Sequence, residues 1–229
     1  MSAHISTVVS VADPAERGQQ WSRAVRYAGA AALFGLGALW FMGDLAFPGH
    51  EGEERSAWIA SHPLVTGLAV SAEILAVPLI FGAAMVWFTL SRSASPRLAW
   101  GGVVLLTCAA AGQGVLEGAE LVGYAVARSR TGLDAPLWAV MDHESGPPMV
   151  TFMALFFLGA FLGILVAMVA VWRARVLPRA AVALVLVSQA IEFVDIPLAG
   201  TAVGLIALTW MAIHLVRLAP RPAQVIRDA

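Results

Sequence analysis

The fold class of this chain is decided by residues 178–218, which read PRAAVALVLVSQAIEFVDIPLAGTAVGLIALTWMAIHLVRL. As one helix this apolar stretch would extend about 60 Å, at about 1.5 Å per residue. The hydrocarbon core of a bilayer is about 30 Å thick, so the stretch fits two crossings rather than one. The break falls at Asp195-Ile196-Pro197, because proline removes an N–H donor and clashes with the preceding turn. We therefore predict two membrane helices, at residues 178–195 and 198–218.

The rest of the chain repeats this pattern of long apolar stretches and short polar connections. It predicts four more membrane helices, at residues 22–47, 63–90, 97–126 and 148–172. Hydrophobic residues make up 59% of the chain and charged residues 13%, about half the roughly 25% charged share of soluble proteins. The sequence therefore predicts an all-α polytopic membrane bundle of six transmembrane helices over residues 22–218, with polar tails at 1–21 and 219–229.

The arginines set the expected orientation of this bundle, and the chain contains no lysine. Arg55, Arg128 and Arg130 fall on one side of the predicted helices. The other side carries Arg17, Arg23, Arg26, Arg92, Arg97, Arg173, Arg175, Arg179, Arg217, Arg221 and Arg227. Because cytoplasmic loops carry the excess of basic residues, we expect both termini in the cytoplasm and the protein in the plasma membrane.

Composition excludes several classes of function. The formal net charge is −1, which does not favour nucleic acid as a partner. Without lysine, the chain cannot form the Schiff base of a retinal pigment or of a Schiff-base enzyme. Cys108 is the only cysteine, so an intrachain disulfide and thiol-pair redox chemistry are excluded. The expected partners are therefore the membrane and a hydrophobic small molecule or lipid, whereas the oligomeric state is not indicated.

Glu73 is the residue whose position in the sequence most clearly indicates a function. It lies about 15 Å into the helix predicted at residues 63–90, where a charged side chain costs about 2.5–3.5 kcal/mol. We expect it to face the bundle interior in a protonated or paired form, and a neutral carboxylic acid can donate a proton. Pro78, one turn further on, leaves the carbonyl of Ile74 without its helical hydrogen bond. The alternative is a protonated glutamate that only packs against a neighbouring helix.

Two of the outward-running helices end with a glutamine and two acids on one face. These residues are Gln113, Glu117 and Glu120 in one helix and Gln189, Glu192 and Asp195 in the other. Spacings of three and four residues place side chains on the same face of a helix. Asp44 ends the first helix in a similar position. Helix ends near lipid headgroups tolerate charge, so Asp44 and Asp195 have a structural explanation as well, whereas Glu117 and Glu192 lie one turn deeper.

His143 precedes the helix at residues 148–172 and is flanked by Asp142 and Glu144. It could serve as an acid, a base or a metal ligand, although a loop histidine is more often simply exposed. Bundles that bind two metals use a Glu-x-x-His pair on each of two helices, and the acid pairs of this chain lack those histidines. We predict no cofactor; a divalent metal held by these carboxylates would be one that prefers oxygen ligands.

The chain combines six predicted helices with an acidic first outer loop and the segment Trp58-Ile59-Ala60-Ser61-His62-Pro63, which leads into the second helix. In this combination it resembles small bacterial membrane proteins, and this resemblance implies a fold and no activity. The chain also resembles, in type, the integral-membrane terpene cyclases. Those are small, all-helical and without a diphosphate-binding motif, and they are thought to protonate an alkene or epoxide with buried carboxylic acids.

That resemblance implies that the acids would be Glu73, Glu117, Glu192 and Asp195. The chain departs from the terpene cyclases in being poor in tyrosine, with only Tyr27 and Tyr124. Phenylalanine and tryptophan would then have to stabilise a cationic intermediate.

The favoured hypothesis is a membrane-embedded enzyme that transfers protons to a hydrophobic, isoprenoid-like substrate, as in cyclisation or isomerisation. Its catalytic residues would be Glu73, Glu117, Glu192, Asp195 and His143. Gln113, Glu120, Gln189 and Asp44 would bind the substrate.

Two alternatives stay open. A proton- or cation-coupled transporter is favoured by a faint repeat, in which an acid and a branched aliphatic residue end three helices at Asp44, Glu120 and Asp195. The scarcity of polar residues in the cytoplasmic half argues against it. An accessory membrane subunit that uses its acids to bind a partner is the third hypothesis.

Overall fold

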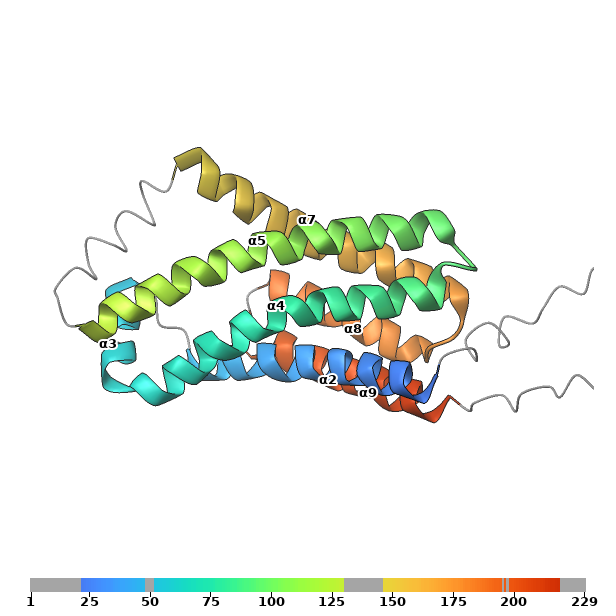
Figure 1. Cartoon of the computed structure of the whole chain (residues 1–229), viewed down its shortest axis with the longest axis horizontal. Coiled ribbons are helices and arrows are strands. Elements are labelled where there is room, and N and C mark those ends of the chain that lie inside the picture. The colour runs from blue at the N-terminus through green and yellow to red at the C-terminus, as the bar shows by residue number, and fades with distance from the viewer. Residues whose placement is uncertain (1–21, 48–51, 130–145, 195, 197, 219–229) are drawn as a thin grey trace, which may run out of the picture.

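The computed structural model describes residues 22–47, 52–129, 146–194, 196 and 198–218. The described residues form seven helices and no strand (Figure 1). The helices are α2 (Arg23–Ala46), α3 (Gly52–Ser61), α4 (Pro63–Ser91), α5 (Pro96–Ser129), α7 (Gly146–Ala174), α8 (Arg179–Phe193) and α9 (Ala199–Arg217). Five of them, namely α2, α4, α5, α7 and α9, are long and apolar enough to cross a membrane. The all-helical class is therefore confirmed, and five of the six predicted spans are helices of a length and composition that suit a membrane crossing.

The predicted break in the last apolar stretch is also confirmed. Helix α8 ends at Phe193 and α9 begins at Ala199. Between them Leu198 has a φ of 60°, a left-handed conformation that is rare for leucine and takes the chain out of one helix into the next. Asp195 and Pro197 lie outside the described residues. The fifth predicted helix differs from the other five, because the 15 residues of α8 extend only about 22 Å, less than the bilayer core.

Six helices pack in the order α7, α5, α4, α2, α9, α8, each mainly against the next one, and a weak contact between α7 and α8 closes the ring (Figure 1). Helix α7 packs closely on α5 but contacts α8 much less, and its first turns lean away from α8. Helix α2 begins and α9 ends at the same end of the bundle, which we call the core end. The short helix α3 packs on α5 and α4 at the opposite end, which we call the cavity end.

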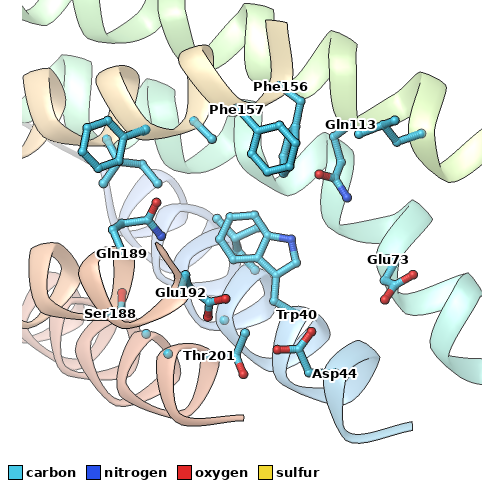
Figure 2. Close-up of a pocket in the computed structure, with 18 of the residues that line it drawn as sticks. Trp40, Asp44, Glu73, Gln113, Phe156, Phe157, Ser188, Gln189, Glu192 and Thr201 are labelled. Carbon is cyan, nitrogen blue, oxygen red and sulfur yellow. The ribbon is translucent and has the colours of Figure 1, made fainter. Parts of the chain in front are cut away.

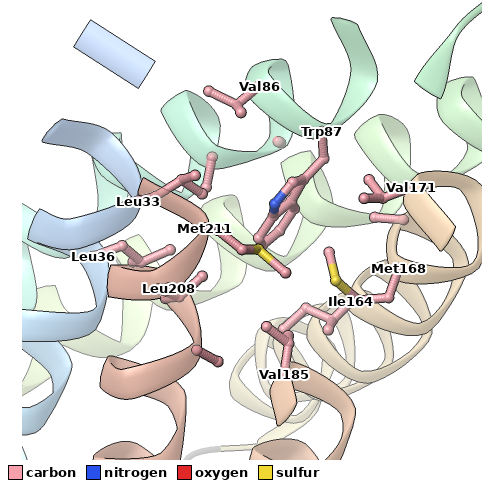
Figure 3. Packing of buried hydrophobic residues seen from close by; sticks show 14 of the residues in the cluster. Leu33, Leu36, Val86, Trp87, Ile164, Met168, Val171, Val185, Leu208 and Met211 are labelled. Carbon is pink, nitrogen blue, oxygen red and sulfur yellow. The ribbon is translucent and has the colours of Figure 1, made fainter. Parts of the chain in front are cut away.

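A cluster of apolar side chains fills the core end (Figure 3). Leu33 of α2, Trp87 of α4, Met168 of α7 and Met211 of α9 meet there and are all buried. These residues lie near the start of α2 and the end of α7 and α9, so the packed core occupies only part of the length of the bundle.

Glycines bring α5 and α7 into close backbone contact. A Cβ atom added at Gly159 would lie 2.7 Å from the backbone nitrogen of Ala109 and from the carbonyl oxygen of Leu105. One added at Gly112 would lie 2.6 Å from the carbonyl oxygen of Phe152. Membrane helices associate through small residues that let backbones approach. This interface fixes the face of α5 that carries Gln113 and Glu117.

Candidate functional site

A cavity of about 650 Å³ occupies the cavity end of the bundle (Figure 2). Its volume lies within the range of about 300–1,000 Å³ that is usual for small-molecule sites. Every described helix contributes to its lining, with Arg55 coming from α3. The packed core begins where the cavity ends, at Trp87, Ile164 and Leu208, which belong to both.

Seven of the nine residues predicted for the site line this one cavity. They are Asp44, Glu73, Gln113, Glu117, Glu120, Gln189 and Glu192. The other two, His143 and Asp195, lie outside the described residues. Helical spacing placed each set on one face of its own helix, and the ring of helices turns these faces toward one another.

Glu73, Gln113 and Glu117 form a polar network between α4 and α5. The amide nitrogen of Gln113 donates a hydrogen bond to Oε1 of Glu117. The carboxyl groups of Glu73 and Glu117 lie within hydrogen-bonding reach of each other. Because ionised carboxylates only accept hydrogen bonds, a bond between these two groups requires a proton on one of them. The pair can therefore hold a transferable proton.

Two acceptor atoms of this network have no hydrogen-bond partner among the described residues. They are Oε1 of Gln113 and Oε2 of Glu117. Gln113 is only 9% exposed and Glu117 only 6%. Buried polar groups are almost always paired. A proton shared with Glu73 satisfies Glu117, whereas Oε1 of Gln113 keeps the capacity to accept one more hydrogen bond.

Sequence reasoning missed Arg55, whose guanidinium forms an ion pair with Glu120 at 2.9 Å. The same group lies 4.3 Å from the ring centre of Phe47. The contact ties α3 to α5 at the rim of the cavity. The only available signal was that Arg55 is one of the few arginines on the predicted outer side.

Two further hydrogen bonds fasten the helices around the rim of the cavity. Nε1 of Trp58, on α3, donates to the carbonyl oxygen of Ala46 at 3.0 Å, which ties α3 to α2. The hydroxyl of Tyr124, on α5, donates to the carbonyl oxygen of Pro63 at 3.0 Å, which ties α5 to the start of α4.

A second polar group lines the opposite wall of the cavity, on α2, α8 and α9 (Figure 2). The carboxyl of Asp44 lies within hydrogen-bonding reach of the side chain of Thr201. Ser188, Gln189 and Glu192 approach from α8. Thr201 and Ser188 were not predicted, because an isolated hydroxyl in an apolar stretch gives no signal of its own.

The remaining walls are apolar and rich in aromatic rings. Trp40 lies between the two polar groups, and Phe156 and Phe157 come from α7 (Figure 2). Glycines make room for the acids: a Cβ atom at Gly43 would lie 2.6 Å from Oε1 of Glu73. The cavity therefore combines carboxyl groups with an aromatic wall.

The described part of the cavity offers no metal site, since no three of its potential ligand side chains lie close enough together to hold one ion. The metal-binding alternative also needed His143 and Asp195, which are not described. His214 does not line the cavity. Its Nε2 is 3.2 Å from the carbonyl oxygen of Val176, in the turn between α7 and α8.

The arrangement can hold a hydrophobic molecule beside a carboxyl pair that shares a proton. A comparison of the chain with protein-family models, curated proteins and solved structures finds no match.

Proposed function

We propose that this protein is a membrane-embedded enzyme that transfers a proton to a hydrophobic, isoprenoid-like substrate, as in isomerisation or cyclisation. The carboxyl pair of Glu73 and Glu117 carries the proposal, because it faces a cavity of about 650 Å³. In such a reaction, the protonated carboxyl adds its proton to a carbon–carbon double bond. The resulting cation then rearranges and loses a different proton to a carboxylate of the cavity wall, and the return of a proton to the pair completes the cycle.

The walls of the cavity suit this chemistry. Aromatic faces stabilise positive charge, and Trp40, Phe156 and Phe157 surround the space beside the carboxyl groups. An apolar enclosure also keeps water from capturing a reactive cation. Glu192 and Asp44, on the opposite wall, can accept the proton that is released.

Deuterium incorporation tests this proposal. We expect the purified protein, incubated in heavy water with linear isoprenoid alcohols such as geraniol, farnesol and geranylgeraniol, to form an isomer that carries one added deuterium. Mass spectrometry detects this product as a shift of one mass unit, because the proton delivered comes from exchangeable carboxyl groups. Recovery of every alcohol unchanged and unlabelled would count against an isoprenoid proton-transfer enzyme.

The transporter alternative has less support. Alternating access needs a path on both sides of the site, whereas the packed core, with Leu33, Trp87 and Met211, fills the core end of the bundle. A cavity closed at one end by apolar packing fits an enzyme that receives its substrate from the bilayer.

We further propose that α8 and α9 both cross the plasma membrane, which gives six spans with both termini in the cytoplasm. Helix α8 alone is shorter than the bilayer core, so the proposal counts the residues between α8 and α9 as part of the crossing. Helix α9 then returns to the end where α2 begins. The excess of arginine at that core end indicates the cytoplasm.

Thiol labelling checks this topology, because Cys108 is the only native cysteine. In a Cys108→Ala background, Ala57→Cys tests α3, Ser93→Cys the α4–α5 connection and Ala219→Cys the C-terminal side. With a membrane-impermeant maleimide and right-side-out vesicles, we expect labelling only of Ala57→Cys until the vesicles are opened. Labelling of Ala219→Cys in closed vesicles would show that α8 and α9 do not both cross. The cysteine-free variant is the control.

A further inference from the structure

We propose that the cavity is a selective binding site for hydrophobic cations, and that these cations enter it from the lipid, between α7 and α8. The inference deepens the proposed function, since it names the charge that the same site prefers. It does not depend on catalysis, because a stable cation that cannot react should bind as well.

The charge balance of the lining is the first argument. Among the described residues of the cavity wall, Arg55 is the only basic side chain. Five residues of the same wall carry carboxyl groups, namely Asp44, Glu73, Glu117, Glu120 and Glu192. The one guanidinium is already engaged by Glu120 at 2.9 Å. An anion bound beside ionised carboxyl groups would be repelled by them, whereas a cation would be attracted.

The unpartnered amide oxygen of Gln113 is the second argument and is independent of the first. Gln113 lines the cavity wall, and its buried Oε1 accepts no hydrogen bond from any described residue. This atom can only accept a hydrogen bond or face positive charge, because an amide oxygen carries no proton. An anionic headgroup, such as a phosphate, would meet a further acceptor here.

The aromatic wall is the third argument. Trp40 stands between the two polar groups, and Phe156 and Phe157 cover the side formed by α7 (Figure 2). A cation within about 6 Å of an aromatic ring centre is attracted to the face of that ring. These rings also exclude water, so the ligand must be hydrophobic over most of its surface.

The route of access follows from the ring of helices. Helix α7 contacts α8 much less than it contacts α5, and its first turns lean away from the bundle. Phe157 lines the cavity and is nevertheless 60% exposed. The weak contact between α7 and α8 makes this side of the cavity wall the one that can open to the outer surface of the bundle. In a membrane that surface faces lipid, where hydrophobic cations accumulate.

Tetraphenylphosphonium is a suitable probe, and tetraphenylborate is an anion of the same shape. We expect the purified protein in detergent to bind radiolabelled tetraphenylphosphonium in equilibrium dialysis. Unlabelled phosphonium should compete at least about tenfold better than the borate, a difference of about 1.4 kcal/mol. Equal competition by the two ions would overturn the inference, because shape and hydrophobicity alone would then explain binding.

Glu117→Gln tests the site itself, because it keeps the shape of the side chain and removes its charge. We expect at least about tenfold weaker binding of the phosphonium. Glu54→Gln is the matched control, since Glu54 is exposed on α3 and does not line the cavity. If Glu117→Gln is not monodisperse, Asp44→Asn on the opposite wall replaces it. Binding that is unchanged in a folded cavity variant would place the cation elsewhere and overturn the inference.

The outcomes separate this inference from the proposed function. A protein that binds the phosphonium in the cavity but gives no deuterated isoprenoid supports cation binding and contradicts the enzyme. A protein that gives the deuterated product and does not bind the phosphonium contradicts cation binding alone.

Discussion

Glu73→Gln is expected to reduce deuterium incorporation into an isoprenoid product by about 10²–10⁴-fold, the usual contribution of a general acid. The glutamine amide has nearly the same size and can still donate a hydrogen bond to Glu117. It cannot give up a proton to a double bond. The fold should be retained, because the substitution removes an ionisable group from an apolar setting and adds no volume. The measurement is the rate of deuterated product formation in heavy water, with size-exclusion profile and helix content recorded on the same sample.

Glu54→Gln again provides the control, since the same chemical change on the exposed face of α3 should leave the rate unaltered. A Glu73→Gln protein that forms deuterated product at the original rate would show that the proton has another source. Glu117→Gln, measured beside it, would then identify which carboxyl of the pair delivers the proton.

Gly159→Leu is expected to destabilise the protein most strongly, through the contact between α5 and α7. A Cβ atom at this position already lies 2.7 Å from two backbone atoms of α5, and a backbone inside a helix cannot shift as a flexible side chain can. Overpacking of a core typically costs about 1–3 kcal/mol, and we expect the upper end or more here. In a chain of this size, about 3 kcal/mol corresponds to a fall of about 6–12 °C in Tm.

The fall in Tm can be followed by fluorescence-detected size exclusion after heating. Gly118→Leu is the matched control, because Gly118 is a glycine of α5, the helix that Gly159 contacts, and a Cβ atom added there meets nothing within 4 Å. Equal melting temperatures for the two variants would mean that the α5–α7 approach does not limit stability. An equal fall in both would mean that the added leucine side chain itself, and not the close approach at Gly159, lowers the Tm.

The sequence predicted the helices well because the bilayer imposes a length and a polarity on every span. The bounds of α4, Pro63–Ser91, differ from the predicted 63–90 by one residue, since prolines and polar turns flank the apolar stretch. Helix α8 is shorter than predicted, because a helix that precedes Asp195-Ile196-Pro197 can end several residues before the proline. Helix α3 lies in the segment that was assigned to the first outer loop, since its ten residues show no long apolar periodicity.

The site was predicted as far as each helix determines it alone. Spacings of three and four residues put Gln113 and Glu117 on one face, and the cost of a buried charge singled out Glu73. The sequence could not predict which residue of one helix contacts which residue of another. The ion pair of Arg55 with Glu120, and the approach of Thr201 to Asp44, depend on how α3 and α9 dock. Docking is decided by packing between helices, which periodicity within one helix does not report.

The division of the bundle into a core end and a cavity end has a consequence for how such a protein can evolve. Met211, near the end of α9, is fully buried in the packed core, whereas Thr201, near its start, lines the cavity. Substitutions in the two halves of one helix therefore fall under different selection. Substitutions around Met211 are limited by the stability of the fold, and those around Thr201 by the ligand that is bound. Related proteins can therefore change their ligand through substitutions at the cavity end while they keep the packed core unchanged.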